Sequence, residues 1–336
     1  MTLINKILIK TIAAESLGVR SFANYIETPS IKIFIDPGCA LGPTKKHKIP
    51  HPYEYLKLIE KTDEIIKYAK NSDVIVISHY HNDHFKNFVS DYFYVFTNSD
   101  IAEQIYTNKI VLLKDSNRYI NYSQKKRAKI LLRNLKKVSD DIIFADGKKI
   151  EFGDTKLNFS VPVYHGEYNS NRGWVIMTSV EVENDVNVLF TSDVQGPIVK
   201  NTMDYIIKNN PNYIFLDSPR IDNCNNIFIN NLKILISISQ KIIIDHHLLR
   251  NRNWHKFLKI KLNDAISKVQ CAAEFNNEKI LMLESIRYLL YDQFPPNTDF
   301  LKWSKLPDNL KKTEKPHVQD DFKSVEDFLN SFDFYS

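Results

Sequence analysis

Cysteine is scarce in this chain, and the few cysteines are far apart. Only three occur among 336 residues, at Cys39, Cys224 and Cys271. An odd number of widely separated cysteines argues against a disulfide framework and indicates a reducing compartment.

Long apolar segments and two common catalytic motifs are also missing. No stretch approaches the roughly 18 apolar residues that a membrane-spanning helix needs. The first ten residues are interrupted by Lys6 and Lys10 and are too short for the apolar region of a signal peptide. We therefore expect a cytoplasmic protein with no membrane partner. Without a G-x-S-x-G elbow or a phosphate-binding P-loop, nothing supports the mechanisms that those motifs serve.

The composition indicates a folded, slightly basic protein. Apolar residues make up 43% of the chain, which is enough to bury a substantial core. We predict one domain over 1–292, with a helical basic insertion at about 101–150, and a C-terminal extension over 293–336. The formal net charge of +5 favours anionic partners or substrates, whereas the sequence defines no oligomeric state.

The densest chemical signal is the segment S-H-Y-H-N-D-H-F. It follows the apolar run 73–78, which is typical of a strand buried on both faces, so the histidines lie at the carboxyl edge of a sheet. Alternate residues of an extended segment point the same way, so His79 and His81 can bind one ion together. Asp83 and His84 follow where we expect the chain to turn into a helix. These ligand types suit zinc, and also iron or manganese; a solvated histidine-rich loop is the alternative.

The H-x-H-x-D-H pattern resembles the signature of the metallo-β-lactamase superfamily. This resemblance implies an α/β chain of the α+β type, folded as a four-layer αββα sandwich with a one- or two-metal site. It also implies further ligands directly after later strands. We identify these as His165 after 157–163, Asp193 after 186–191, and His246 or His247 after 241–245.

The resemblance implies two divalent metal ions, with zinc preferred. The first ion would be held by His79, His81 and His165. The second would be held by Asp83, His84 and one of His246 and His247, with Asp193 bridging both ions. A metal-bound hydroxide would attack the substrate, and Asp83 could instead accept a proton if only the first site is filled. Asp83 and Asp193 are therefore the expected catalytic residues.

Arg250 helps to distinguish the two adjacent histidines. It stands four residues after His246, as an arginine often does after the last ligand in the nuclease branch of the superfamily, which favours His246. Because residues of a strand alternate, we expect only one of the two histidines to point into the site. Asp245 is a candidate orienting partner for His247.

A closer resemblance exists to an uncharacterised, mainly archaeal family of predicted metal-dependent hydrolases within this superfamily. It covers about residues 8–290 and is carried by 15–21, 35–38, 40–43, 192–197 and 245–250. This similarity implies the fold and the metal site but carries no substrate. Cys39 and Asn251 depart from the family pattern, and neither belongs to the ligand set.

Arginine and lysine provide candidate contacts for an anionic substrate. Arg20 and Arg250 could each bind a carboxylate or phosphate through two hydrogen bonds, although structural roles fit them equally well. Residues 123–138 predict an amphipathic helix with five apolar residues inward and seven basic residues on the rest of its surface. The inward residues are Ala128, Leu131, Leu132, Leu135 and Val138. The basic surface is either a contact for a phosphate backbone or simply a solvated face.

These features predict a metal-dependent hydrolase acting on an anionic ester. A phosphodiester, including one in nucleic acid, is the first candidate. Hydrolysis of a small lactone or thioester is the alternative, and a non-hydrolytic metal-binding or redox module is an alternative of another class.

Periodicity predicts several supporting elements. Leu56, Ile59, Ile66 and Ala69 have helical spacing within 53–70 and should form its buried stripe. The helix 199–208, strand 213–216 and helix 226–238 predict a second half-sheet of alternating strands and helices.

Two other segments carry structural predictions. Asp36, which follows the strand 31–36, should be a structural residue near the metal loop. Residues 297–320 are predicted to be irregular, followed by a terminal helix that docks on the body or on a partner subunit. The apolar positions of that helix are Phe322, Val325, Phe328, Leu329 and Phe332.

Overall fold

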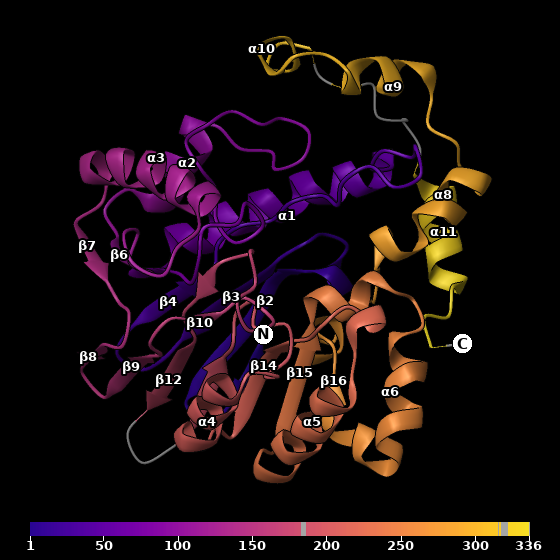
Figure 1. Ribbon diagram of the computed structural model, residues 1–336. Coiled ribbons are helices and arrows are strands. Elements are labelled where there is room, and N and C mark those ends of the chain that lie inside the picture. The colour runs from indigo at the N-terminus through magenta and orange to yellow at the C-terminus, as the bar shows by residue number, and fades with distance from the viewer. Residues whose placement is uncertain (183–185, 315, 317–321, 336) are drawn as a thin grey trace.

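The computed structural model describes residues 1–182, 186–314, 316 and 322–335. Two seven-stranded sheets lie face to face, and helices cover both outer faces (Figure 1). One outer layer contains helices α1, α2 and α3, which span Pro52–Lys70, Ser99–Tyr106 and Tyr122–Val138. The other contains α4, α5 and α6, which span Lys200–Asn209, Asn226–Ile238 and Trp254–Leu262. The predicted four-layer αββα sandwich is confirmed.

The two sheets share one design, in which an antiparallel part adjoins a parallel part. The first has the order β1-β2-β3-β4-β5-β6-β7, with strands at Thr2–Ile4, Ile7–Ala14, Phe22–Glu27, Lys32–Ile35, Val74–Ile77, Ile110–Leu113 and Asp141–Phe144. The second has the order β16-β15-β14-β13-β12-β9-β8, with strands at Val269–Gln270, Lys241–Asp245, Tyr213–Asp217, Asn187–Phe190, Thr178–Val182, Thr155–Phe159 and Lys149–Phe152. Strands β4 to β7 are parallel to one another, as are β13 to β16.

Strand β5 shows how the layers are held together. Val74 and Val76 lie in the core between the sheets, whereas Ile75 and Ile77 pack in the second core beneath α1 and α3. Both faces of this strand are therefore buried, as its continuous apolar sequence predicts. Burying each such side chain contributes about 1.5–3 kcal/mol, so the strand that precedes the metal motif is firmly anchored.

The segment 101–150 differs from the prediction of a helical insertion. Its strands β6 and β7 extend the first sheet parallel to β5. Helix α2 is the crossover from β5 to β6, and α3 is the crossover from β6 to β7. The short strands Ile110–Leu113 and Asp141–Phe144 are flanked by charged residues, which hides them in the sequence. The basic helix α3 is thus part of the sandwich itself.

Helix α1 is correctly located, but its buried face is rotated from the predicted one. Tyr55, Leu58, Ile65 and the predicted Ala69 are buried, whereas the predicted Leu56, Ile59 and Ile66 are only partly buried. Aromatic residues of later segments pack against Tyr55 and so determine which face turns inward.

The C-terminal extension packs on the domain and is more helical than predicted. Residues expected to be irregular form α9 (Thr298–Ser304) and α10 (Asp308–Lys311), while 315 and 317–320 lie outside the described part of the chain. Trp303 of α9 packs against Tyr55, and the centroids of the two rings are 5.0 Å apart. The terminal helix α11 (Lys323–Ser331) buries Val325 and Leu329 in the core of the same chain. No helix among the described residues is long and apolar enough to cross a membrane.

We predict that Trp303→Ala lowers the free energy of unfolding by about 3–5 kcal/mol, because it removes a buried ring from the seam between α9 and α1. Leu310→Ala, on the neighbouring helix, is the control, since Leu310 is 40% exposed. Urea denaturation of both variants measures the difference. A loss in Trp303→Ala no larger than that in Leu310→Ala would contradict the role of this ring in the seam.

Candidate metal centre

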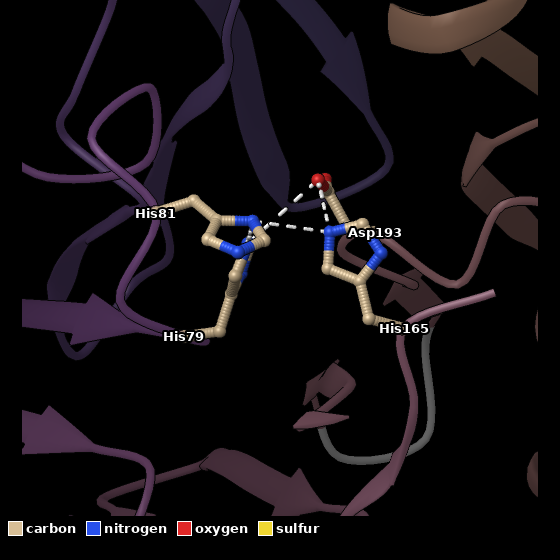
Figure 2. Close-up of side chains that lie close together, drawn as sticks. All are labelled: His79, His81, His165 and Asp193. Carbon is tan, nitrogen blue, oxygen red and sulfur yellow. Dashed lines mark hydrogen bonds and ion pairs between the residues drawn. The ribbon is translucent and has the colours of Figure 1, made fainter. Parts of the chain in front are cut away.

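The predicted ligands meet at the edge where the parallel strands of both sheets end. His79 and His81 follow β5, Asp193 follows β13, and His246 follows β15. His165 follows β10 (Val163–Tyr164), which forms a small ribbon with β11 (Trp174–Val175). Figure 2 shows the imidazoles of His79, His81 and His165 directed toward the carboxylate of Asp193.

One group of ligand atoms surrounds the position predicted for the first ion. Nε2 of His79 and Nε2 of His165 each lie 3.1 Å from Nδ1 of His81. Oδ2 of Asp193 lies 3.0 Å from His165 Nε2 and 3.7 Å from His79 Nε2. Tetrahedral ligands about 2.0–2.1 Å from an ion are roughly 3.3–3.4 Å apart, so the three imidazoles and the carboxylate fit one metal ion.

A second group lies on the other side of Asp193. Its carboxylate has Oδ1 2.9 Å from His84 Nε2 and Oδ2 3.4 Å from His246 Nε2. Asp83 Oδ2 lies 3.8 Å from the same nitrogen of His246. Asp193 therefore contacts both groups, as expected of a carboxylate that bridges two ions.

The donor atoms themselves test whether cations fit here. His84 Nε2 and Asp193 Oδ1 are buried and have no hydrogen-bond partner among the described residues, although they lie 2.9 Å apart. Buried polar atoms almost always have a partner, and their desolvation is costly without one. Converging imidazole and carboxylate lone pairs are the donor set that binds zinc, iron or manganese, so the residues fit a metal centre.

The nitrogen on the far side of most ligand imidazoles has its own protein partner. Asp36 Oδ2 lies 2.9 Å from His84 Nδ1, and Ser78 Oγ lies 3.1 Å from His79 Nδ1. Asp36 also accepts hydrogen bonds from the backbone nitrogen and hydroxyl of Ser78. Such contacts fix the orientation of the rings before a metal binds. Asp36 therefore has the structural place predicted for it.

Four non-glycine residues of the site adopt positive φ angles. These are Asp36 at 52°, Ser192 at 53°, Gln195 at 49° and His246 at 71°. Each non-glycine residue in this region costs of the order of 1–3 kcal/mol, and such strain is concentrated at functional sites. The surrounding hydrogen bonds hold it in place, because Asp36 is bound to Ser78 and Ser192 Oγ lies 2.6 Å from Ser78 Oγ.

The local path after His81 differs from the prediction. Asp83 and His84 lie in a turn closed by a 3.0 Å hydrogen bond from the His84 nitrogen to the His81 carbonyl. The next helix, α2, begins only at Ser99. A tight turn directs His84 back toward Asp193, which a continuing helix would not do.

His246 and His247 both lie near Asp193, but their surroundings differ. Strand β15 ends at Asp245, and a 3₁₀ turn over His246–Arg250 replaces the alternation of the strand. His247 has both nitrogens engaged by protein groups, with Nδ1 2.9 Å from Asp217 Oδ1 and Nε2 3.0 Å from the side-chain nitrogen of Gln195.

His246 has the geometry of the metal ligand. Its Nδ1 lies 2.7 Å from Glu15 Oε2, and its Nε2 lies 3.4 Å from Asp193 Oδ2 and 3.8 Å from Asp83 Oδ2, with Arg250 Nη2 3.2 Å away. The predicted role of Asp245 as a partner of the other imidazole is not found. Its carboxylate accepts hydrogen bonds from the backbone nitrogens of His246, Ser16 and Ala272 instead.

Burial and neighbouring carboxylates shift the protonation of the cluster in opposite directions. Burial disfavours a charged imidazole, but Asp193 and Asp36 together outweigh it and raise the pKa of His84 well above its ordinary value. The same balance, with Glu15 as the main carboxylate, raises the pKa of His246 to about 10. Burial and neighbouring imidazoles lower the pKa of His79 well below its ordinary value. The site thus favours positive charge around Asp193, which bound cations supply without protons.

The two arginines predicted to contact substrate are both engaged by protein carboxylates. Arg20 donates two hydrogen bonds to Glu284, at 2.6 and 2.7 Å. Arg250 donates from Nε to Glu15 at 2.6 Å, and its Nη2 lies 3.2 Å from His246 Nε2 and 3.9 Å from Asp83 Oδ2. Arg250 is therefore next to the second ligand group, whereas Arg20 forms an ion pair with Glu284.

Sequence reasoning missed several residues that orient the ligands. Glu15 and Gln195 lie in segments that carry the family resemblance, so that similarity was the available signal. Gln124, whose side-chain nitrogen lies 3.4 Å from His81 Nε2, and Asp217 had no such signal.

Relatives of the chain are archaeal proteins. A UPF0282 protein of Methanocaldococcus jannaschii is 39% identical over 288 residues, which cover 82% of this chain and 94% of the relative. A UPF0282 protein of Korarchaeum cryptofilum is 33% identical over 308 residues, which cover 88% of this chain and 98% of the relative. No family model matches the sequence.

Among solved structures, a possible metal-dependent hydrolase of Veillonella parvula has a TM-score of 0.49 and 14% identity over 80% of this chain and 97% of its own. A TM-score of this size does not assign a fold, so the assignment rests on the sheet order and the ligand positions. Together these define a metallo-β-lactamase fold with a histidine and carboxylate centre at one sheet edge. The chain belongs to the UPF0282 family. The predicted resemblance to an archaeal family is confirmed.

We predict unequal effects of alanine at the two adjacent histidines. His246→Ala should remove one metal ion per chain, because His246 Nε2 faces Asp193. His247→Ala should retain both ions, because its two nitrogens are engaged by Asp217 and Gln195. Elemental analysis after reconstitution with zinc measures both. Equal metal content in the two variants would contradict the assignment of His246.

Proposed function

We propose that the protein is a metal-dependent hydrolase with two divalent ions, preferably zinc, and that its substrate is an anionic ester of the phosphodiester class. The observation that carries this proposal is the pair of ligand groups that share Asp193. Divalent cations bound there would lower the pKa of a water and stabilise negative charge on the substrate. The chain's own residues supply orientation, charge and a proton acceptor.

Asp83 is the most accessible carboxylate of the ligand set. Its side chain is 18% exposed, whereas that of Asp193 is 2% exposed. Asp83 Oδ2 lies 3.8 Å from His246 Nε2 and 3.9 Å from Arg250 Nη2. It can therefore serve as a ligand of the second ion, or accept a proton at Oδ2 when that position is not filled.

Guanidinium groups near the ligands favour a negatively charged substrate over a neutral lactone. Arg127 donates from Nε to the carbonyl of Tyr80, between the first two histidine ligands, at 2.5 Å. Arg172 is exposed and donates from Nη1 to Gln195 at 2.5 Å, beside His247. Together with Arg250, they place three guanidinium groups near the ligands. A phosphodiester can bind to these groups, since guanidinium binds phosphate oxygens strongly.

We predict that the zinc-loaded protein hydrolyses bis(p-nitrophenyl) phosphate and has lower activity on a neutral lactone or a thioester. Arg172→Ala should raise KM for the diester about tenfold or more, because it removes a charge-assisted hydrogen bond from an accessible position. Arg252→Ala is the control, since Arg252 is also exposed. Steady-state kinetics give both values. Preference for the lactone or thioester, with no effect of Arg172→Ala, would overturn the proposed substrate class.

A further inference from the structure

The basic residues of helix α3 do not form one surface. Lys125, Lys129, Arg133 and Lys136 line one groove, whereas Lys126 and Arg127 line a separate cleft that also contains Asp91 and Asp308. The first group recurs about every 6 Å along the helix axis and extends over roughly 16 Å. We call these four residues the basic track.

The groove along the basic track is lined by cations. It encloses about 810 Å³, and its lining contains no acidic residue. Within the described part of the chain, none of the four cations forms an ion pair. Leu132, Ile142 and Phe144 form its apolar side and are only partly buried.

An aromatic cluster includes Tyr119, which follows the groove residues Ser116 and Asn117 in the chain. Tyr119, Tyr164, Tyr168 and Trp174 lie with neighbouring ring centroids 5.0 to 6.0 Å apart. Tyr119 and Tyr168 are 61% and 70% exposed. We call these four residues the aromatic platform.

The platform is joined to both the metal centre and the basic track. Tyr164 directly precedes His165 on the ribbon of β10 and β11. Tyr119 lies two residues after Asn117, which lines the groove of the basic track. Hydrogen bonds from Asn121 to the Asn171 carbonyl and from Gln124 to the Arg172 carbonyl tie the start of α3 to the ribbon.

We propose that the basic track and the aromatic platform bind a single strand of nucleic acid, whose phosphodiester is the substrate of the proposed hydrolase. Exposed rings stack on unpaired bases, and regularly spaced cations follow the backbone, which is how single strands are bound without sequence preference. A duplex hides its bases from such a platform. An anionic membrane is disfavoured because the apolar face of α3 is buried in the core, so no apolar wedge is free to insert. This inference rests on the proposed function.

The first test measures binding of a fluorescent single-stranded RNA or DNA oligonucleotide to the zinc-loaded protein across a salt series. Replacing all four residues of the basic track by glutamine should flatten the slope of log K against log salt by about 0.7 per cation. The control replaces Lys233, Lys256, Lys259 and Lys261, which are exposed on α5 and α6, and removes the same charge. Equal flattening in both variants, or no binding of either oligonucleotide at low salt, would overturn the proposal.

The second test addresses the platform. Tyr168→Ala should weaken single-strand binding about fivefold or more, whereas Tyr168→Phe keeps the ring and should bind normally. Neither change should alter binding of a duplex. Equal binding of duplex and single strand, without an effect of Tyr168→Ala, would contradict a single-stranded ligand. Stronger binding to vesicles of anionic lipid than to any oligonucleotide would also contradict it.

Hydrolysis assays distinguish a failure of nucleic-acid binding from a failure of the proposed hydrolase activity. The variant of the basic track should still hydrolyse bis(p-nitrophenyl) phosphate but lose cleavage of the oligonucleotide. Hydrolysis of the small diester without oligonucleotide binding would overturn the inference alone. Oligonucleotide binding without hydrolysis of any diester would overturn the proposed function.

Discussion

One buried carboxylate determines the organisation of this protein. Asp193 lies between 2.9 and 3.7 Å from a nitrogen of His79, His84, His165 and His246. Such a group is unstable in a core without compensating positive charge, so the imidazoles around it have to be held in position. Ligands from the ends of β5, β10, β13 and β15 meet there only because the two sheets present the carboxyl ends of their parallel strands at the same edge.

The strands and the ligands were predictable because their signals are local. A short apolar run followed by histidine or aspartate specifies a buried strand and a ligand at its end, as at Ile77 and His79. The residues that orient the ligands were not predictable from the same pattern. Glu15 binds His246 across 231 positions of the chain, and no local periodicity specifies that pairing.

Tertiary packing also explains the other differences. Leu56 and Ile59 have helical spacing, yet rings from α9 and from the loop after the metal motif pack on Tyr55 and turn another face inward. The strands β6 and β7 are recognised only in the folded sheet, where β6 pairs with β5 and β7 pairs with β6. Because α3 is the crossover between them, its cations are a fixed feature of the sandwich, and only the start of the helix contacts the metal edge, through Gln124 and Arg127.

The proposed function requires Asp193 to bridge two metal ions. Crystals grown with zinc, with data collected on both sides of the zinc absorption edge, test it most directly. We expect two anomalous peaks beside Asp193, one among His79, His81 and His165 and the other among Asp83, His84 and His246. A single peak, or a second peak bound by His247 in place of His246, would contradict the account.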